Sequence, residues 1–294
     1  MNDDSVLQLV NHLSSYLGAQ IQVQRRIAAY GARREIAEIK EKLAVNPRRL
    51  ELYGFKVYSQ GDEDGIIEEI FNRLGICVGT FCEIGVENGL ECNSLYLIHK
   101  GWRGCWLEGN SKQQEPIISK FSSLLLNHRL AVAIGYVTPQ NINQAVADVL
   151  QGISINYEEL DFLSIDIDGM DIYLLEAINF RPKVICIEYN AKFPPPVHKK
   201  PVFDPECIWR QTDYMGASLV ALVESASQLG YVLVCTNICG ANAFFVRADL
   251  VNDAFDTSLR VKELYNPCRY HLIADLYYHD AGHPADFGPY VDLI

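Results

Sequence analysis

From about residue 55 onward, short apolar runs alternate with longer amphipathic stretches, and this alternation is what most constrains the fold. Strands that are apolar on both faces and are separated by helices are typical of a parallel sheet with helices on each side. The candidate strands are 80–85, 105–108, 130–135, 162–167 and 184–188, and the candidate helices are 62–74, 91–100, 111–126, 139–151 and 171–179.

The pattern changes after residue 230. Apolar runs at 231–236 and 243–247 flank a short Asn-Ile-Cys-Gly-Ala-Asn segment, which predicts an antiparallel hairpin. The predicted fold class is therefore α/β, with a doubly wound, mostly parallel seven-stranded sheet that carries this hairpin at one edge.

The first fifty residues lack a strand pattern. Apolar residues recur at helical spacing and are followed by mixed basic and acidic residues, which predicts two helices. We expect these helices to pack on the main domain or on a partner subunit, and to make the protein a homo-oligomer. The predicted organisation is a helical extension at 1–50, a main domain at 51–250 with a lid at 191–214, and a tail at 251–294 packed on the domain or on a partner subunit.

Composition narrows the possible partners. The 294 residues include 25 Lys and Arg against 37 Asp and Glu, a net charge of −12, so we expect neither nucleic acid nor a membrane surface as a partner. No apolar run approaches the roughly 20 residues that span a bilayer. Nine cysteines without a C-x-x-C pair are typical of reduced thiols, and we expect a cytoplasmic protein.

A glycine turn follows the first candidate strand. Glu83, Gly85 and Gly89 form E-x-G-x-x-x-G, not the G-x-G-x-x-G of a dinucleotide site, and further glutamates in the loop would repel a pyrophosphate. Glycines here let the backbone turn tightly and approach a ligand. Glu108 ends the next strand, 25 residues after Glu83, where an acid can accept the hydroxyls of a ribose. The alternative is an ordinary strand-to-helix turn with a solvated acid at the next strand end.

The combination of this turn, the acid after the second strand and the late hairpin resembles the class I S-adenosylmethionine-dependent methyltransferases. Further segments resemble the FkbM-like branch of that family, which is often found in natural-product and glycan biosynthesis. The segments that resemble this branch are Ser-Gln-Gly-Asp-Glu-Asp-Gly at 59–65, Glu-Cys-Asn-Ser-Leu-Tyr at 91–96, Lys-Gly-Trp-Arg-Gly at 100–104, Phe-Leu-Ser-Ile-Asp-Ile-Asp-Gly at 162–169 and Ile-Glu-Tyr-Asn at 187–190. The resemblance as a whole covers about residues 55–250.

The resemblance implies S-adenosylmethionine as the cofactor. Its amino-acid end would lie against Glu83, Gly85 and Gly89, and Glu108 would hold its ribose. The other cofactor-binding residues that the resemblance implies are Ser59, Gln60, Asp64, Asn93 and Asp166.

Carboxylates also follow the fourth and fifth candidate strands. Asp166 and Asp168 leave one face of their strand, and Glu188 and Asn190 have the same relation on the next strand. If the two strands are neighbours, Asp168 and Glu188 converge, and converging carboxylates repel unless a cation lies between them. The cation is either a hard divalent ion such as Mg²⁺ or a protonated or sulfonium ligand. Otherwise Asp168 and Asp171 cap the following helix, and Glu188 pairs with a basic residue.

A group of sugar and antibiotic O-methyltransferases, which this region is similar to, holds Mg²⁺ with an Asp after the fourth strand and a Glu-Asp pair after the fifth. The similarity implies Asp168, Glu188 and Asn190 as metal ligands, with Asn190 in place of the usual acid. It also implies Asp168, Asp171 and Glu188 as catalytic residues, with Asp171 at the position of a His base.

The long segment after the fifth strand is rich in proline and aromatic residues. Loops of this length are usually lids or binding loops. We expect Phe193, Trp209 and Tyr214, together with Tyr189, to bind the methyl acceptor, although these aromatics could instead pack on the surface.

The function predicted from the sequence is transfer of a methyl group to a hydroxyl of a sugar or small natural product, with possible help from Mg²⁺. N-methylation of a small molecule is the nearest alternative. A third reading is a catalytically silent member of the fold that serves as a binding or assembly subunit.

Overall fold

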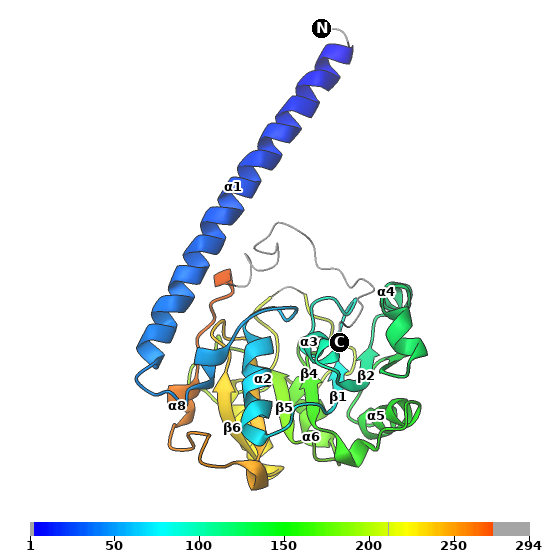
Figure 1. Ribbon diagram of the computed structural model, residues 1–294, viewed down its shortest axis with the longest axis vertical. Coiled ribbons are helices and arrows are strands. Elements are labelled where there is room, and N and C mark those ends of the chain that lie inside the picture. Colours follow the sequence, from blue (N-terminus) through cyan, green and yellow to red (C-terminus); the bar gives the residue numbers. More distant parts are fainter. Residues whose placement is uncertain (1–2, 211, 273–294) are drawn as a thin grey trace, which may run out of the picture.

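The computed structural model describes residues 3–210 and 212–272. It consists of one seven-stranded sheet with helices on both faces, and a long N-terminal helix that extends away from this body (Figure 1).

The strand order confirms the predicted fold class. The sheet has the order β3-β2-β1-β4-β5-β7-β6; β1 to β5 pair in parallel, and β7 runs antiparallel to both β5 and β6. The hairpin therefore joins the sheet through β7. The strands are β1 Thr80–Ile84, β2 Arg103–Glu108, β3 Leu130–Ile134, β4 Phe162–Ile165, β5 Val184–Glu188, β6 Tyr231–Thr236 and β7 Asn242–Arg247.

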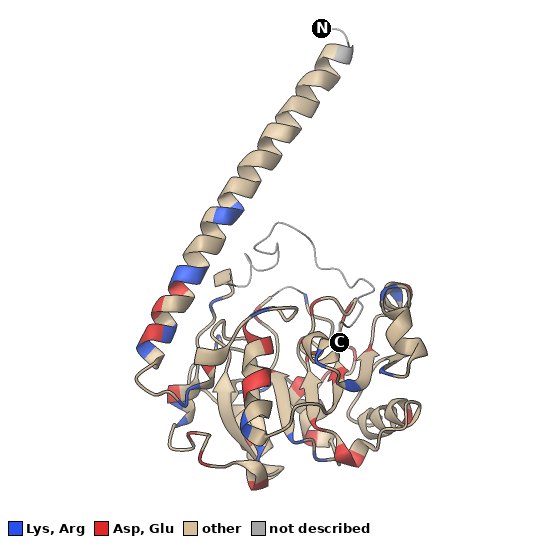
Figure 2. Cartoon of the chain, viewed as in Figure 1, with Lys and Arg blue, Asp and Glu red and all other residues tan. Residues whose placement is uncertain are grey.

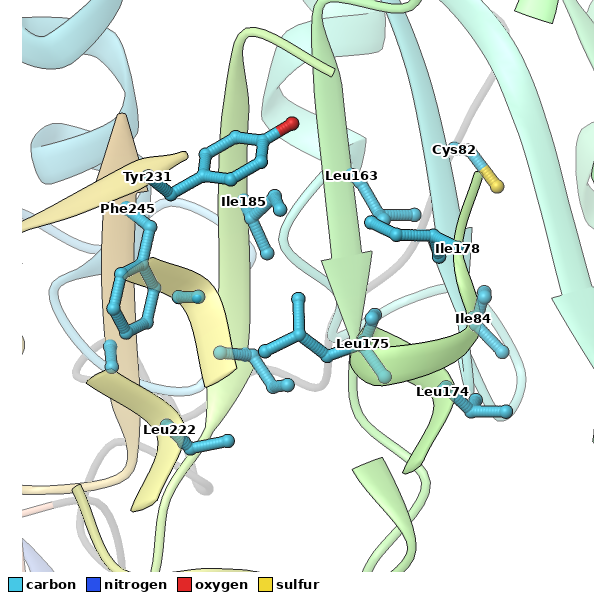
Figure 3. Packing of buried hydrophobic residues seen from close by; sticks show 14 of the residues in the cluster. Cys82, Ile84, Leu163, Leu174, Leu175, Ile178, Ile185, Leu222, Tyr231 and Phe245 are labelled. Atoms are coloured by element: carbon cyan, nitrogen blue, oxygen red, sulfur yellow. The ribbon is translucent and has the colours of Figure 1, made fainter. Parts of the chain in front are cut away.

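The central strands are buried on both faces, as their continuous apolar runs predict. On one face Leu163 and Ile185 of the paired strands β4 and β5 pack with Leu175 and Leu222 from the covering helices and with Phe245 of β7 (Figure 3). On the other face of the sheet, Phe81, Trp106 and Phe162 form a second hydrophobic core with another set of helices.

The helices that cover the first face are α5 Ile142–Gln151, α6 Asp171–Ala177 and α7 Leu219–Gln228, and those on the second are α2 Glu63–Leu74, α3 Leu95–His99 and α4 Gln114–Leu126. A short helix, α8, spans Val261–Leu264, and 3-10 turns lie at Leu50–Tyr53 (η1), Ser111–Gln113 (η2), Tyr157–Glu159 (η3) and Ala248–Leu250 (η4). None of the helices in the described part is both long enough and apolar enough to cross a membrane.

The N-terminal region is one helix rather than the two predicted. Helix α1 runs over Asp3–Leu43 without a break. Gly18 and Gly31 each cost about 1 kcal/mol in a helix, but they do not end it, and the first proline of the chain is Pro47.

In the described part of the chain, it is the last part of α1 that packs on the body. Ala32, Ile36 and Ile39 contact Ile238 and Leu272. Nearby, the Lys40 ammonium donates a hydrogen bond to the Gly54 carbonyl at 2.6 Å, and the imidazole of His271 lies 2.9 Å from the Glu35 carboxylate. The start of the predicted tail therefore contacts α1, while its remainder, 273–294, lies outside the described residues.

Candidate active site

Three neighbouring strands bring polar side chains to one edge of the sheet, beside the glycine turn that follows a fourth. Gly85 follows β1, Asp166 follows β4, Glu188 ends β5 and Asn242 begins the antiparallel strand β7. Glu188 and Asn242 are direct partners in the β5–β7 register, and Asp166 follows Ile165, whose partner on β5 is Ile187. This row lies at the carboxyl end of the parallel strands, where ligands of such sheets bind.

Three carboxylates converge there. Asp166, Asp168 and Glu188 each offer one oxygen, and these oxygens lie within 4.8 Å of one another. This confirms that Asp168 and Glu188 meet, and it adds Asp166, which the sequence placed in the cofactor site. Asp168 is exposed and has a left-handed φ of 57°, so the loop after β4 turns sharply to bring it back to the cluster. We call these three residues the carboxylate cluster.

Burial and mutual repulsion shape the electrostatics of this cluster. Burial raises the pKa of the Glu188 carboxyl well above its ordinary value, and the charges of Asp166, Asp171 and Asp168 raise it further. Burial likewise raises the pKa of Asp166, and the charges of Asp171, Asp168, Glu83 and Glu63 add to the effect. The Glu188 side chain is 8% exposed, and among the described residues its Oε2 has no hydrogen-bond partner. The arrangement suits a cation, which would satisfy this oxygen and relieve the repulsion.

Asp171 is held by the backbone of the loop between β4 and α6, and its predicted role as a base stays a prediction. It is fully buried at the start of α6, and its two oxygens accept the backbone N–H groups of Ile167 and Gly169, each at 2.9 Å. Burial raises its pKa to about 6. With both oxygens bound to its own loop, Asp171 positions the segment that carries Asp168.

The glycine turn is built as predicted. Gly85 has a left-handed φ of 83°, and a Cβ at this position would lie 1.7 Å from the carbonyl oxygen of Asp166. Gly89 has φ 77°, and a Cβ there would lie 2.5 Å from the Trp106 ring. Both positions require glycine, and the turn packs directly against the loop after β4.

The buried side chains of Glu83 and Asn93 form hydrogen bonds that hold this turn in place. The Glu83 carboxylate accepts the backbone N–H groups of Asn93 and Ser94, at 2.8 and 2.9 Å, and the Ser94 hydroxyl at 2.5 Å. The Asn93 amide donates to the Ser164 hydroxyl at 3.0 Å. Glu83 and Asn93 therefore hold the loop after β1 onto the sheet. They lie beneath the loop at which the sequence predicts the cofactor site.

Glu108 links the end of β2 to the glycine turn. Its Oε2 accepts the N–H groups of Val86 and Glu87 at 3.1 and 2.7 Å, and its Oε1 accepts the N–H of Asn110 at 2.7 Å. A carboxylate has about four lone-pair positions, so one remains for a hydroxyl donor. Glu108 thus lies beside the turn, as the sequence predicts.

The loop before α2 folds around a buried acid. Asp64 Oδ2 accepts the N–H groups of Val57, Tyr58 and Ser59 at 2.6 to 3.0 Å, and the Ser59 hydroxyl accepts the N–H of Asp64 at 3.2 Å. Gln60 is half-buried, and its carbonyl accepts the Lys56 ammonium at 3.3 Å. Ser59 and Asp64 give this loop its shape, and their predicted contact with a cofactor stays a prediction.

The two residues after Glu188 do not join the cluster. Tyr189 is fully buried in the core on the opposite face, where its hydroxyl donates to the Asn266 carbonyl at 2.5 Å, because successive strand residues point to opposite faces. Its predicted contact with an acceptor is therefore not observed. The Asn190 side chain accepts the N–H of Lys192 at 3.0 Å and donates to the Asp213 carbonyl at 2.9 Å. Asn190 thus fastens the lid at both ends rather than facing a metal.

The predicted lid is an irregular segment whose aromatic residues lie outward. Trp209 is 40% exposed and donates from its indole to the Thr212 carbonyl at 2.9 Å, and Tyr214 is 60% exposed. Phe193 is half-buried. Acceptor binding by these residues stays a prediction.

Glu63 and Asn242 are site residues that the sequence analysis did not single out. Glu63 is fully buried at the start of α2 and accepts hydrogen bonds from the amides of Asn237, at 2.5 Å, and Asn242, at 3.1 Å. The Asn242 Oδ1 is buried and finds no hydrogen-bond partner within residues 3–210 and 212–272, and Asn242 is the register partner of Glu188. Glu63 lies inside the segment that resembles the methyltransferases, whereas Asn242 emerges only from the pairing of β5 with β7.

No protein-family model matches the chain, and no curated protein sequence matches it. Solved structures that resemble it include a candidate caffeoyl-CoA O-methyltransferase from Staphylococcus aureus, with a TM-score of 0.42, 15% identity, and coverage of 72% of this chain and 91% of that chain. An O-methyltransferase from Bacillus cereus in complex with SAH has a TM-score of 0.36 and 16% identity over 73% of this chain and 89% of that chain. A SAM-dependent methyltransferase from Aquifex aeolicus has a TM-score of 0.35 and 13% identity over 71% and 97%. These likenesses are distant, and the fold assignment rests on the strand order of this chain itself.

Proposed function

We propose that this protein is an S-adenosylmethionine-dependent methyltransferase that methylates a hydroxyl of a sugar or small natural product, with a divalent cation held by the carboxylate cluster. The observation that carries the proposal is the convergence of Asp166, Asp168 and Glu188 beside the glycine turn of β1. The support is that the cofactor residues implied by the sequence and a site for a hard cation lie at the same edge of the sheet.

The residues at this edge fit the cofactor in three respects. Gly85 leaves half-buried backbone without a side chain at the turn, which the buried Gly89 lets fold tightly, and Glu108 keeps one acceptor position for a ribose hydroxyl. The surrounding carboxylates, including Glu87, whose pKa is raised by burial and then by Asp168 and Glu108, favour a positively charged ligand. When bound, S-adenosylmethionine supplies a methyl group on a sulfonium, which needs no further activation.

The carboxylate cluster fits a divalent cation by the chemistry of its donors. Oxygen ligands are those that Mg²⁺ prefers, and the partnerless Glu188 Oε2 is a buried acceptor that a cation would satisfy. Asp166, Asp168 and Glu188 would hold the ion, which would supply Lewis acidity toward an acceptor hydroxyl.

The remaining catalytic work belongs to positioning and proton transfer. Alignment of a nucleophile with a methyl group is worth roughly 7–11 kcal/mol as effective molarity. Asp171 fixes the loop that presents Asp168, and Asp168 is the exposed acid of the cluster. We assign to the Asp168 carboxylate the role of proton acceptor because of this exposure; burial and the charge of Glu108 raise its pKa above the ordinary value.

Calorimetry with S-adenosylhomocysteine tests the cofactor. We expect binding to the wild-type protein, a loss of about tenfold or more in affinity for Glu108→Ala because the ribose acceptor is removed, and no change for Asp148→Ala, whose side chain is exposed on α5. Absence of binding to folded wild-type protein would contradict the proposal and would favour a catalytically silent subunit.

Titration with Mg²⁺ in place of the cofactor tests the cluster. We expect heat of Mg²⁺ binding that disappears in Asp168→Ala while S-adenosylhomocysteine still binds, because Asp168 offers an oxygen to the cluster and its side chain is exposed. Equal Mg²⁺ binding by wild type and Asp168→Ala would remove the metal from the proposal, and the methyltransferase assignment would then rest on the cofactor result.

A further inference from the structure

Most of helix α1 projects from the body with an apolar surface in solvent. Residues 5–31 extend beyond the contact that Ala32, Ile36 and Ile39 make with the body (Figure 1). Eleven large apolar side chains of this segment are 42–71% exposed, and seven of them recur at spacings of three, four or seven: Val6, Leu9, Leu13, Tyr16, Val23, Ile27 and Tyr30. A lone helix is only marginally stable in water, so a projecting helix of this length calls for a packing partner.

The spacing of these side chains is that of a coiled coil. With Val6 at heptad position a, the a positions are Val6, Leu13, Gln20 and Ile27, and the d positions are Leu9, Tyr16, Val23 and Tyr30. A repeat of 3.5 residues keeps such a seam facing a second helix over its whole length. We call these eight residues the α1 seam.

The contact of α1 with its own domain leaves the seam open. In the same register Ala32 and Ile39 occupy f and Ile36 occupies c, the positions opposite a and d on the helix. The domain therefore holds one side of the helix and presents the other side outward.

The seam itself indicates a second copy of this chain as the partner. Gln20 is its one amide, the other members being aliphatic or aromatic, and in two parallel helices in register this amide meets its own copy, for which its donor and its acceptor are complementary. A single polar residue at position a is a known determinant of register and of the number of helices. In an antiparallel pair a positions face d positions, and Gln20 would meet an apolar side chain instead.

Charge favours the same partner. Residues 5–24 contain no Asp, Glu, Lys or Arg, and this half of α1 is free of charge colouring in Figure 2. Two copies can therefore approach without repulsion. A membrane surface fits less well, because interfacial helices carry Lys and Arg along their polar face and this segment has none.

We propose that α1 forms a parallel coiled coil with α1 of a second copy through the α1 seam, so that the protein is a dimer with two catalytic domains at one end of the stalk. The seam spans 25 residues, about 36 Å of helix. Covering its exposed side chains buries on the order of 700 Å² per helix, close to the roughly 800 Å² per partner of a stable interface.

Sedimentation of the full-length chain with paired variants tests the proposal. We expect wild type to sediment at twice the 33.1 kDa of one chain, and Leu13→Glu with Ile27→Glu, both at a, to raise the dissociation constant about a hundredfold or more. The matched control is Leu7→Glu with Ile21→Glu, both at b, equally spaced and of similar exposure, which we expect to stay dimeric. Circular dichroism establishes that each variant is folded.

The contradicting outcomes are distinct. A wild-type monomer over a wide range of concentrations, or a dimer that survives the substitutions at a, overturns the proposal and leaves the seam to a different protein. Orientation is tested with Gln20→Cys under oxidised glutathione, where a parallel pair gives a disulfide-linked dimer on a denaturing gel. Wild type with its nine free cysteines is the control, and absence of the linked dimer overturns the parallel arrangement.

Discussion

The packing of the protein requires glycine at position 85, directly after β1. At Gly85 the φ of 83° and the closeness of the Asp166 carbonyl both exclude a side chain. We expect Gly85→Ala to lower the free energy of unfolding by about 3 kcal/mol or more, because the added Cβ both strains the backbone and pushes the loop after β4 outward.

Gly135 provides the matched control for this substitution. It follows β3 as Gly85 follows β1, yet nothing lies within 4 Å of the position its Cβ would occupy. We expect Gly135→Ala to change the free energy of unfolding in urea by less than about 1 kcal/mol. Equal effects of the two substitutions would show that the turn after β1 is not held against the loop after β4.

At the scale of a loop, Asp64 ties residues 57–59 to the start of α2. Burial raises the pKa of its carboxyl from an ordinary 3.8 to about 6 despite the three N–H groups it accepts. The folded state therefore binds a proton more tightly than the unfolded state between these two values. Stability from this group is present in full below pH 4 and is lost as the pH rises to about 6, by an amount on the order of 3 kcal/mol.

We expect Asp64→Asn to flatten the dependence of unfolding free energy on pH between about 4 and 6, since Asn keeps an acceptor but does not ionise. Asp64→Ala should flatten it too but should also lower stability throughout by about 2 kcal/mol or more, because three buried N–H groups lose their acceptor. Urea unfolding at several pH values measures both. An unchanged slope in Asp64→Asn would mean that this carboxyl does not take up a proton on folding.

Elements were easier to predict than the directions of side chains. Continuous apolar runs predicted β1 to β5, since strands buried on both faces have this pattern. The turn after β1 was predicted from its glycines, because its backbone conformation requires glycine. Spacing alone could not tell that Asp171 turns back onto the N–H groups of its own loop while Asp168 turns outward. The partner of Glu188 was missed for another reason: Asn242 reaches it only through the register between β5 and β7.

The two halves of α1 differ in what they do for the whole molecule. The outer half carries the apolar seam, whereas the inner end covers Ile238 and Leu272 and donates the Lys40 ammonium to Gly54. Assembly and domain stability should therefore be separable along a single helix, because no hydrophobic core of the described domain includes a residue before Ala32.

Two truncations test this separation. Deletion of residues 1–30 removes the seam but keeps Ala32, Ile36 and Ile39, so we expect a monomer whose thermal midpoint at low concentration stays within about 2 °C of wild type. Deletion of residues 1–43 also uncovers Ile238 and Leu272, and the loss of this contact should lower the midpoint by a further 5 °C or so. Scanning calorimetry and sedimentation measure both properties. If the shorter deletion already lowered the midpoint that far, the outer half of α1 would be part of the domain's own fold, and assembly could not be its separate role.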